Sequence, residues 1–133
     1  MASTISTRLM INGTAITSDP ISVDYTKSNN VEAPAIETGG YDITAGGDVA
    51  IYSTPAATPT RTFLYIKNTG AVGQNFITIV YTMLCGEAAT DFTVARLELG
   101  EYMYVPLAPS ISVKAASSAA GTARIEYGYF SAA

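Results

Sequence analysis

The second half of the sequence, residues 61–130, is a ladder of short segments in which apolar side chains alternate with polar ones. Each segment closes at Gly, Asn, Pro or a small polar cluster. The segments read RTFLYIKNTG, NFITIVYTML, DFTVARLELGE, YMYVPLAP, SISVKA and TARIEYGYF. A period of two residues is that of a β-strand with one buried face. This half of the chain therefore predicts a series of strands joined by turns.

The alternation also predicts which way the side chains point. Leu64 and Ile66 share one face of their segment and are expected to point inward, with Phe63 on the opposite face. Residues 76–84 are apolar on both faces, which is typical of a central strand covered on both sides. Pro106 cannot donate a hydrogen bond to a neighbouring strand, so its segment is expected at the edge of a sheet.

The first half of the chain is richer in turn-forming residues and predicts only short strands. KSNN at 27–30, TGG at 38–40 and AGGD at 45–48 are each expected to be turns. Ile21, Val23 and Tyr25 alternate with polar residues and predict one short strand between such turns. Residues 41–52 predict two short strands that meet at Gly46-Gly47.

Together these segments predict an all-β chain without a strong helix. About eight strands at intervals of roughly 8–12 residues are typical of a sandwich or barrel. We expect a single β-sandwich, jelly-roll-like, with an extended N-terminal segment. Residues 1–20 are expected to form an arm or an edge strand, and residues 21–133 one sandwich domain, best defined at 60–131.

Composition favours assembly and argues against two classes of partner. Only 14% of the residues are charged, which suits a surface covered by neighbouring subunits. The net charge is −4 and the cations are spread singly, so no direct nucleic-acid contact is expected. The N-terminus has no secretory pattern and the longest apolar run is too short to span a bilayer, so no membrane contact is expected either.

The residue types needed for common catalytic and metal sites are scarce. The chain has no histidine and one cysteine, Cys85, which we interpret as a small buried apolar residue. No nucleophile–base pair, phosphate-binding loop or transition-metal motif is present. Asp42 and Asp48 bracket a glycine-rich turn, but their spacing does not match a calcium loop. The sequence predicts no enzyme, no cofactor and no metal site.

The tyrosines have two expected roles, packing in the sandwich and recognition at an interface. Tyr81 and Tyr127 are expected to pack in the sandwich with their hydroxyls at its rim. Tyr102 and Tyr104 share one face of their strand, and both an interface role and a core role remain open for them. The candidate interface residues are Ile5, Leu9, Ile11, Tyr102 and Tyr104.

Particular turn sequences carry a resemblance to a class of known proteins. The residues concerned are Leu64, Ile66, Asn68 and Gly70, then Leu99, Gly100, Glu101, Pro106 and Leu107, then Ile111, Val113, Lys114 and Ala115. In this arrangement the second half of the chain resembles small structural proteins of tailed bacteriophages, among them capsid decoration proteins and tail or fibre components. It departs from their pattern at Leu99, where a proline often stands.

The resemblance implies a virion protein assembled in a host cytoplasm and packed as repeated copies. Its expected function is capsid decoration by a homo-oligomer, possibly a trimer, with the major capsid protein or another virion protein as partner. The alternative is a carbohydrate- or receptor-binding sandwich module associated with a tail or fibre. A hydrolase is the third possible class, and no motif in the chain favours it.

Overall fold

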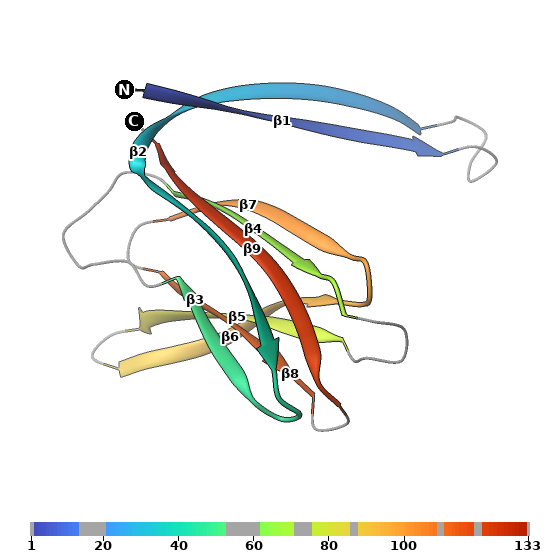
Figure 1. Cartoon of the computed structure of the whole chain (residues 1–133), viewed down its shortest axis with the longest axis vertical. Coiled ribbons are helices and arrows are strands. Elements are labelled where there is room, and N and C mark those ends of the chain that lie inside the picture. The colour runs from blue at the N-terminus through green and yellow to red at the C-terminus, as the bar shows by residue number, and fades with distance from the viewer. Residues whose placement is uncertain are drawn as a thin grey trace.

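A computed structural model describes residues 2–13, 21–52, 62–70, 76–85, 88–108, 111–118 and 121–132, without the side chains of 2–3, 21, 31–37, 84–85 and 131–132. Within those ranges the chain forms nine strands and no helix (Figure 1). The strands are β1 (Ala2–Gly13), β2 (Ile21–Ile43), β3 (Asp48–Tyr52), β4 (Thr62–Asn68), β5 (Ile77–Cys85), β6 (Ala88–Leu97), β7 (Tyr102–Leu107), β8 (Ser112–Ser117) and β9 (Ala123–Ala132).

The strands form two antiparallel sheets that face each other. The five-stranded sheet has the order β1-β2-β9-β4-β7 and the four-stranded sheet the order β3-β8-β5-β6. Without β1, the remaining eight strands have the order of a jelly roll, four in each sheet. The predicted fold class is therefore confirmed. The predicted edge position of the Pro106 strand is confirmed, because β7 is an edge strand, and β5 is central in its sheet, between β8 and β6. The prediction that β5 is covered on both faces was wrong, because its outer face carries Thr82 beside the partly exposed pair of Lys114 and Asp91.

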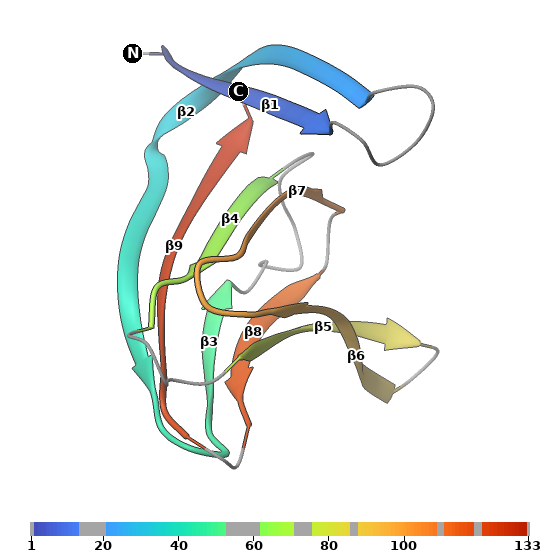
Figure 2. The ribbon, with the colours of Figure 1, turned by 90° about the vertical axis from the view of Figure 1, so that its right-hand side faces the viewer.

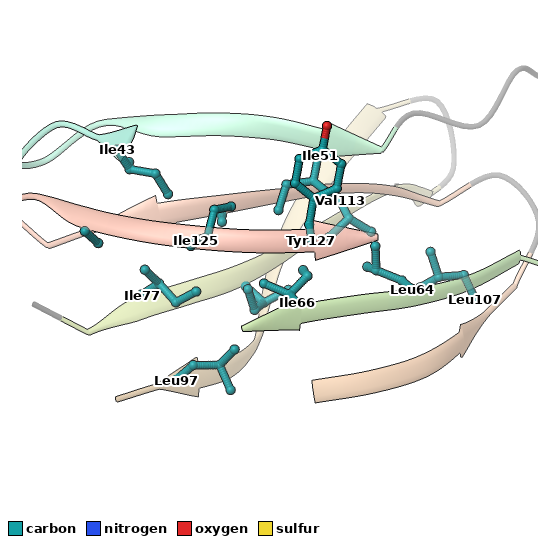
Figure 3. Close-up of a cluster of buried hydrophobic side chains, with 13 residues drawn as sticks. Ile43, Ile51, Leu64, Ile66, Ile77, Leu97, Leu107, Val113, Ile125 and Tyr127 are labelled. Carbon is teal, nitrogen blue, oxygen red and sulfur yellow. The ribbon is translucent and has the colours of Figure 1, made fainter. Parts of the chain in front are cut away.

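The core lies between the two sheets and is built from alternate residues of their strands (Figure 3). Leu64 and Ile66 of β4 are fully buried, as the alternation predicted, and they belong to the same buried cluster as Ile77 and Ile79 of β5 in the opposite sheet. Tyr127 of β9 is also buried, which confirms its predicted packing role. Tyr81 is partly buried and packs against the same cluster.

The prediction of short strands in the first half was wrong for β2, which runs for 23 residues. KSNN at 27–30 and TGG at 38–40 both lie inside this strand and not at turns. Gly39 stands opposite Tyr127 of β9, and a Cβ there would lie 2.9 Å from the Tyr127 hydroxyl. The glycine thus makes room for an aromatic ring from the neighbouring strand. AGGD behaves as predicted: residues 44–47 form a turn in which Gly46 has a φ of 71°.

β2 pairs with different strands along its length. Its residues 21–32 pair with β1, whereas its residues 36–43 pair with β9. Val31 also pairs with Ala132 of β9, and the register with β9 shifts between Val31 and Ile36. We call β1 together with residues 21–32 of β2 the N-terminal ribbon. The ribbon curls over one end of the sandwich (Figure 2).

The turn sequences that carried the resemblance lie against each other. Glu98 to Glu101 form a turn closed by a 3.0 Å bond from the Glu101 amide to the Glu98 carbonyl, with Gly100 at a φ of 83°. The Gly100 amide donates to the Asn68 carbonyl, and the Asn68 amide donates to the Glu101 carbonyl. The buried Asn68 side chain donates to the Leu97 carbonyl and accepts from the Gly70 amide, each at 3.1 Å. We call this arrangement the Asn68 clasp.

A charged cluster links strands on the outer face of the four-stranded sheet. Lys114 of β8 lies 2.7 Å from Asp91 of β6 and 3.7 Å from Asp48 of β3. Thr82 of β5 also donates to Asp91 at 2.7 Å. The hydrogen bond from Lys114, followed by that from Thr82, holds the pKa of the Asp91 carboxyl below its usual range.

This lowered pKa predicts a pH dependence of stability. Because the Asp91 pKa is lower in the folded chain than in the unfolded chain, its contribution is fully present above about pH 4 and is lost as the pH falls. We expect Asp91→Asn to make the free energy of unfolding less dependent on pH between about pH 5 and pH 2. Urea titrations at several pH values measure this. Lys114→Met should have the same effect, and an unchanged pH dependence in both variants would contradict the assignment.

Candidate functional site: a groove between the ribbon and the sheet

The N-terminal ribbon has one polar face and one apolar face. On the polar face, Arg8 forms two hydrogen bonds of 2.8 and 2.7 Å with Asp24, and Ser6 lies 2.7 Å from Ser28. The bond from Arg8 lowers the pKa of Asp24. The strand register places most of the apolar residues on the other face, together with Thr7 and Lys27: these are Ile5, Leu9, Ile11, Val23 and Tyr25. The exposed Met10 is the exception and lies on the face of Arg8.

That apolar face is largely exposed to solvent. Leu9 is 49% exposed, Ile11 47% and Tyr25 72%. Single apolar residues on a surface are common, but several on one face of a narrow ribbon form a continuous patch. The ribbon therefore presents a surface that its own chain covers only in part.

A groove of about 430 Å³ separates the ribbon from the outer face of the five-stranded sheet. The ribbon side of the groove is formed by Thr7, Arg8, Leu9, Tyr25 and Lys27, and the sheet side by Tyr65, Tyr102, Met103 and Tyr104. This volume is in the range of small-ligand sites. Residues from both ends of the sequence thus form one concave and mainly apolar surface.

The tyrosines of the groove differ in their surroundings. Tyr102 is 63% exposed, whereas Tyr104 is half-buried and its ring stacks on Phe63 with centroids 6.1 Å apart. Tyr65 donates a 3.4 Å hydrogen bond to Glu126. Burial, followed by the negative charge of Glu126, raises the pKa of the Tyr65 hydroxyl. The groove thus combines exposed aromatic surface with a few polar atoms at its margin.

The structure brings together some of the predicted interface residues. Leu9, Tyr102 and Tyr104 line the same groove, although more than ninety residues separate the first from the others along the chain. Ile5 and Ile11 share the apolar ribbon face with Leu9 but do not line the groove. Sequence reasoning did not assign Tyr25, Tyr65 or Lys27 to this surface. The alternation of Tyr25 with polar residues was its only signal.

Other possible sites have simpler explanations. Asp42 pairs with Arg124 at 2.9 Å and Asp48 lies near Lys114, so both turn carboxylates have cationic neighbours. Among the residues that the structure describes, no group of three or more Cys, Asp or Glu side chains could hold a metal ion. No helix long and apolar enough to cross a membrane occurs in the described part of the chain.

Comparison with known proteins relates this chain to others by fold. No protein-family model matches the chain, and no curated protein matches it by sequence. In structure it is similar to a protein from Bacillus endospore appendages, which are described as a novel family of disulfide-linked pili. The TM-score is 0.50 and the sequence identity 18%, over 73% of this chain and 86% of that one. At this identity, the similarity concerns the all-β fold.

Proposed function

We propose that this chain is a non-enzymatic structural subunit that assembles with copies of itself. The observation that carries the proposal is the N-terminal ribbon, whose apolar face is left largely exposed. An isolated two-stranded ribbon is marginally stable in water, and an exposed apolar patch on it gains stability when a neighbouring subunit covers it. The low content of charged residues agrees with a surface that is covered in an assembly.

The proposed assembly is non-covalent. The structural neighbour belongs to appendages described as disulfide-linked. This chain has a single cysteine, Cys85, so each copy can form at most one disulfide with another copy. One disulfide per subunit joins a pair and cannot connect a continuous series. Strand pairing and apolar contacts are therefore the forces that we propose for this protein.

The more specific assignment is to the shell of a tailed-bacteriophage virion, as a capsid decoration protein that binds the major capsid protein. Support for it comes from the turn sequences of the Asn68 clasp and from the jelly-roll fold, which occurs in viral capsid domains. In that setting, many copies multiply a weak contact between each subunit and the shell. The protein would act by adhesion.

The experiment that tests self-assembly is solution mass by light scattering. We expect the full chain to be oligomeric and Leu9→Ser with Ile11→Ser to lower its mass, because both changes fall on the exposed apolar face. Ser22→Ala with Ser28→Ala, on the polar face of the ribbon but on β2, is the matched control and should leave the mass unchanged. A monomeric wild-type chain would contradict the proposal. For the virion assignment, deletion of the residues before Pro20 should weaken attachment to particles while the sandwich stays folded.

The tyrosine-lined groove favours a second candidate, a carbohydrate-binding module of a tail or fibre. Tyr25 and Tyr102 expose aromatic surface on opposite sides of the groove, and Lys27 adds a polar group on the ribbon side. Aromatic rings with one wet end suit sugar recognition because they offer both an apolar face and a hydrogen-bonding hydroxyl. Binding to a glycan array that is lost in Tyr102→Ala, by a monomeric chain, would favour this candidate over assembly.

A further inference from the structure

The free edges of the two sheets differ in how well they resist pairing with another strand. Edge strands commonly carry a proline, a bulge or a short length that prevents such pairing. β7 has six residues and contains Pro106. β3 has five residues and an irregular register with β8. β6 skips Val94 in its pairing with β5, which is the signature of a bulge.

β1 has none of these features. Its 12 residues pair with β2 in an unbroken register from Ala2 to Gly13, and it contains no proline. Its one charged residue, Arg8, is paired with Asp24 on the neighbouring strand. Among the edges that the structure describes, β1 is therefore the one best suited to accept a further strand.

The groove lies beside this edge. Three consecutive residues of β1, from Thr7 to Leu9, line it on one side, and three consecutive residues of β7, from Tyr102 to Tyr104, line it on the other. Thr7 and Leu9 share one face of the ribbon with Lys27 and Tyr25 of β2, and all four residues line the groove, so the groove runs along β1 between this face and the edge strand β7. A groove of this kind fits an extended segment that adds to the sheet by backbone pairing.

We propose that the occupant is β1 of a second copy, which pairs antiparallel with β1 around a two-fold axis at Thr7. This inference rests on the proposed self-assembly and specifies its contact. A two-fold contact uses the same surface on both subunits, and β1 supplies both a free edge and apolar side chains on one face. In the pair, Ile5 and Leu9 of the second copy lie over Tyr102 and Tyr104.

The sequence of β1 selects the register. A pair centred on Arg8 places the two guanidinium groups opposite each other, which is destabilising. A pair centred on Thr7 places Ile5 opposite Leu9 of the second copy, twice by symmetry, and Arg8 opposite Ser6. A strand pairing centred on Leu9 sets only one pair of apolar residues against each other, Leu9 of both copies, and places Ile5 opposite Gly13. If one strand slips by a single residue along the other, the apolar face of one strand meets the polar face of its partner, for example Leu9 opposite Ser6. A pairing centred on Met10 also sets apolar residues against each other, Leu9 opposite Ile11, and keeps the two Arg8 side chains apart, but it joins only residues 7–13 of β1. The Thr7 register joins residues 2–12 and is therefore the longest one that satisfies both charge and polarity.

A cysteine introduced on the axis tests this arrangement. Facing residues of antiparallel strands have Cα atoms about 4.5–5.5 Å apart, within the range that a disulfide requires. In the full chain carrying Cys85→Ser, we expect Thr7→Cys to form a covalent dimer under mild oxidation, seen on a non-reducing gel. Lys27→Cys is the matched control, because Lys27 faces Thr7 on β2, away from the free edge, and it should stay monomeric on the gel.

Charge variants next to the axis give a second measurement. Ser6→Lys faces Arg8 of the second copy and should weaken the dimer, whereas Ser6→Glu should strengthen it. Each change acts twice by symmetry, so the dissociation constant should shift roughly two- to thirty-fold, as measured by analytical ultracentrifugation. Ser28→Lys, opposite Ser6 on β2, is the control and should have little effect.

The results of these experiments show separately whether the β1 pairing is right and whether the chain assembles with itself at all. If the wild-type chain is oligomeric but Thr7→Cys gives no covalent dimer, or if Ser6→Lys and Ser6→Glu shift the constant in the same direction, the β1 pairing is wrong while self-assembly stands. If the wild-type chain is monomeric, both are wrong. A covalent Thr7→Cys dimer together with opposite shifts in the two charge variants establishes the pairing.

Discussion

Replacing Ile66 by alanine lowers the free energy of unfolding by about 2–5 kcal/mol. Ile66 has no exposed surface and lies in the cluster between the two sheets. Its strand, β4, is paired on both sides, by β9 and by β7, so the backbone around the site has little freedom to collapse into the space that the substitution leaves. The loss therefore includes both the burial of the removed methyl and methylene groups and the cavity.

Urea denaturation at a concentration where the chain is monomeric measures this change through the transition midpoint. Val94→Ala removes aliphatic groups from a residue that is 45% exposed and serves as the control, with an expected change within about 0.5 kcal/mol. Equal effects of the two substitutions would show that Ile66 is not part of a tightly packed core.

The second large effect is expected for Asn68→Ala. The Asn68 side chain is buried and makes hydrogen bonds to the Leu97 carbonyl and from the Gly70 amide. Alanine removes both hydrogen bonds, so the Leu97 carbonyl loses this donor and the Gly70 amide loses this acceptor in a buried place. Because an unsatisfied buried polar group costs more than a hydrogen bond contributes on average, we expect a loss of about 2–4 kcal/mol.

Two further variants test whether the loss of stability comes from the hydrogen bonds of the Asn68 clasp or from any substitution near this turn. Thr69→Val removes the exposed neighbouring hydroxyl, which lies 3.3 Å from the Arg124 carbonyl, and should have a small effect. Asn68→Asp keeps an acceptor for the Gly70 amide but places a carboxylate beside the Leu97 carbonyl. We expect it to be destabilised at pH 7 and to regain stability as the pH falls, because the protonated acid can donate to that carbonyl. An Asn68→Ala chain as stable as Thr69→Val would contradict the role of the clasp.

The local alternation of apolar and polar residues was sufficient to predict the all-β architecture, but it did not predict the length of the longest strand, β2. The alternation around Leu64 and Ile66 identified the buried face, and Pro106 identified an edge, because both signals depend only on neighbouring residues. The length of β2 could not be predicted in this way. Gly39 is compatible with a strand because Tyr127, distant in the sequence, occupies the space beside it.

The groove shows the same limit for function. Leu9 and Tyr102 were each identified as interface candidates from their local pattern. Their presence on one surface depends on the register of β1 with β2 and on the curl of the ribbon over the sheet, which are long-range properties. The contributions of Tyr25 and Lys27 follow from the same register, which places them opposite Leu9 and Thr7.

The change of partner along β2 divides the molecule into two regions of different local stability. Residues 36–43 of this strand are held by β9 within the sandwich, whereas residues 21–32 are held by β1. Backbone amides of the ribbon can therefore exchange with solvent through an opening that leaves the sandwich closed, at a lower free energy than global unfolding. Such a division lets the N-terminal segment vary in sequence, or detach and re-pair with another chain, while the core keeps its own cooperative transition.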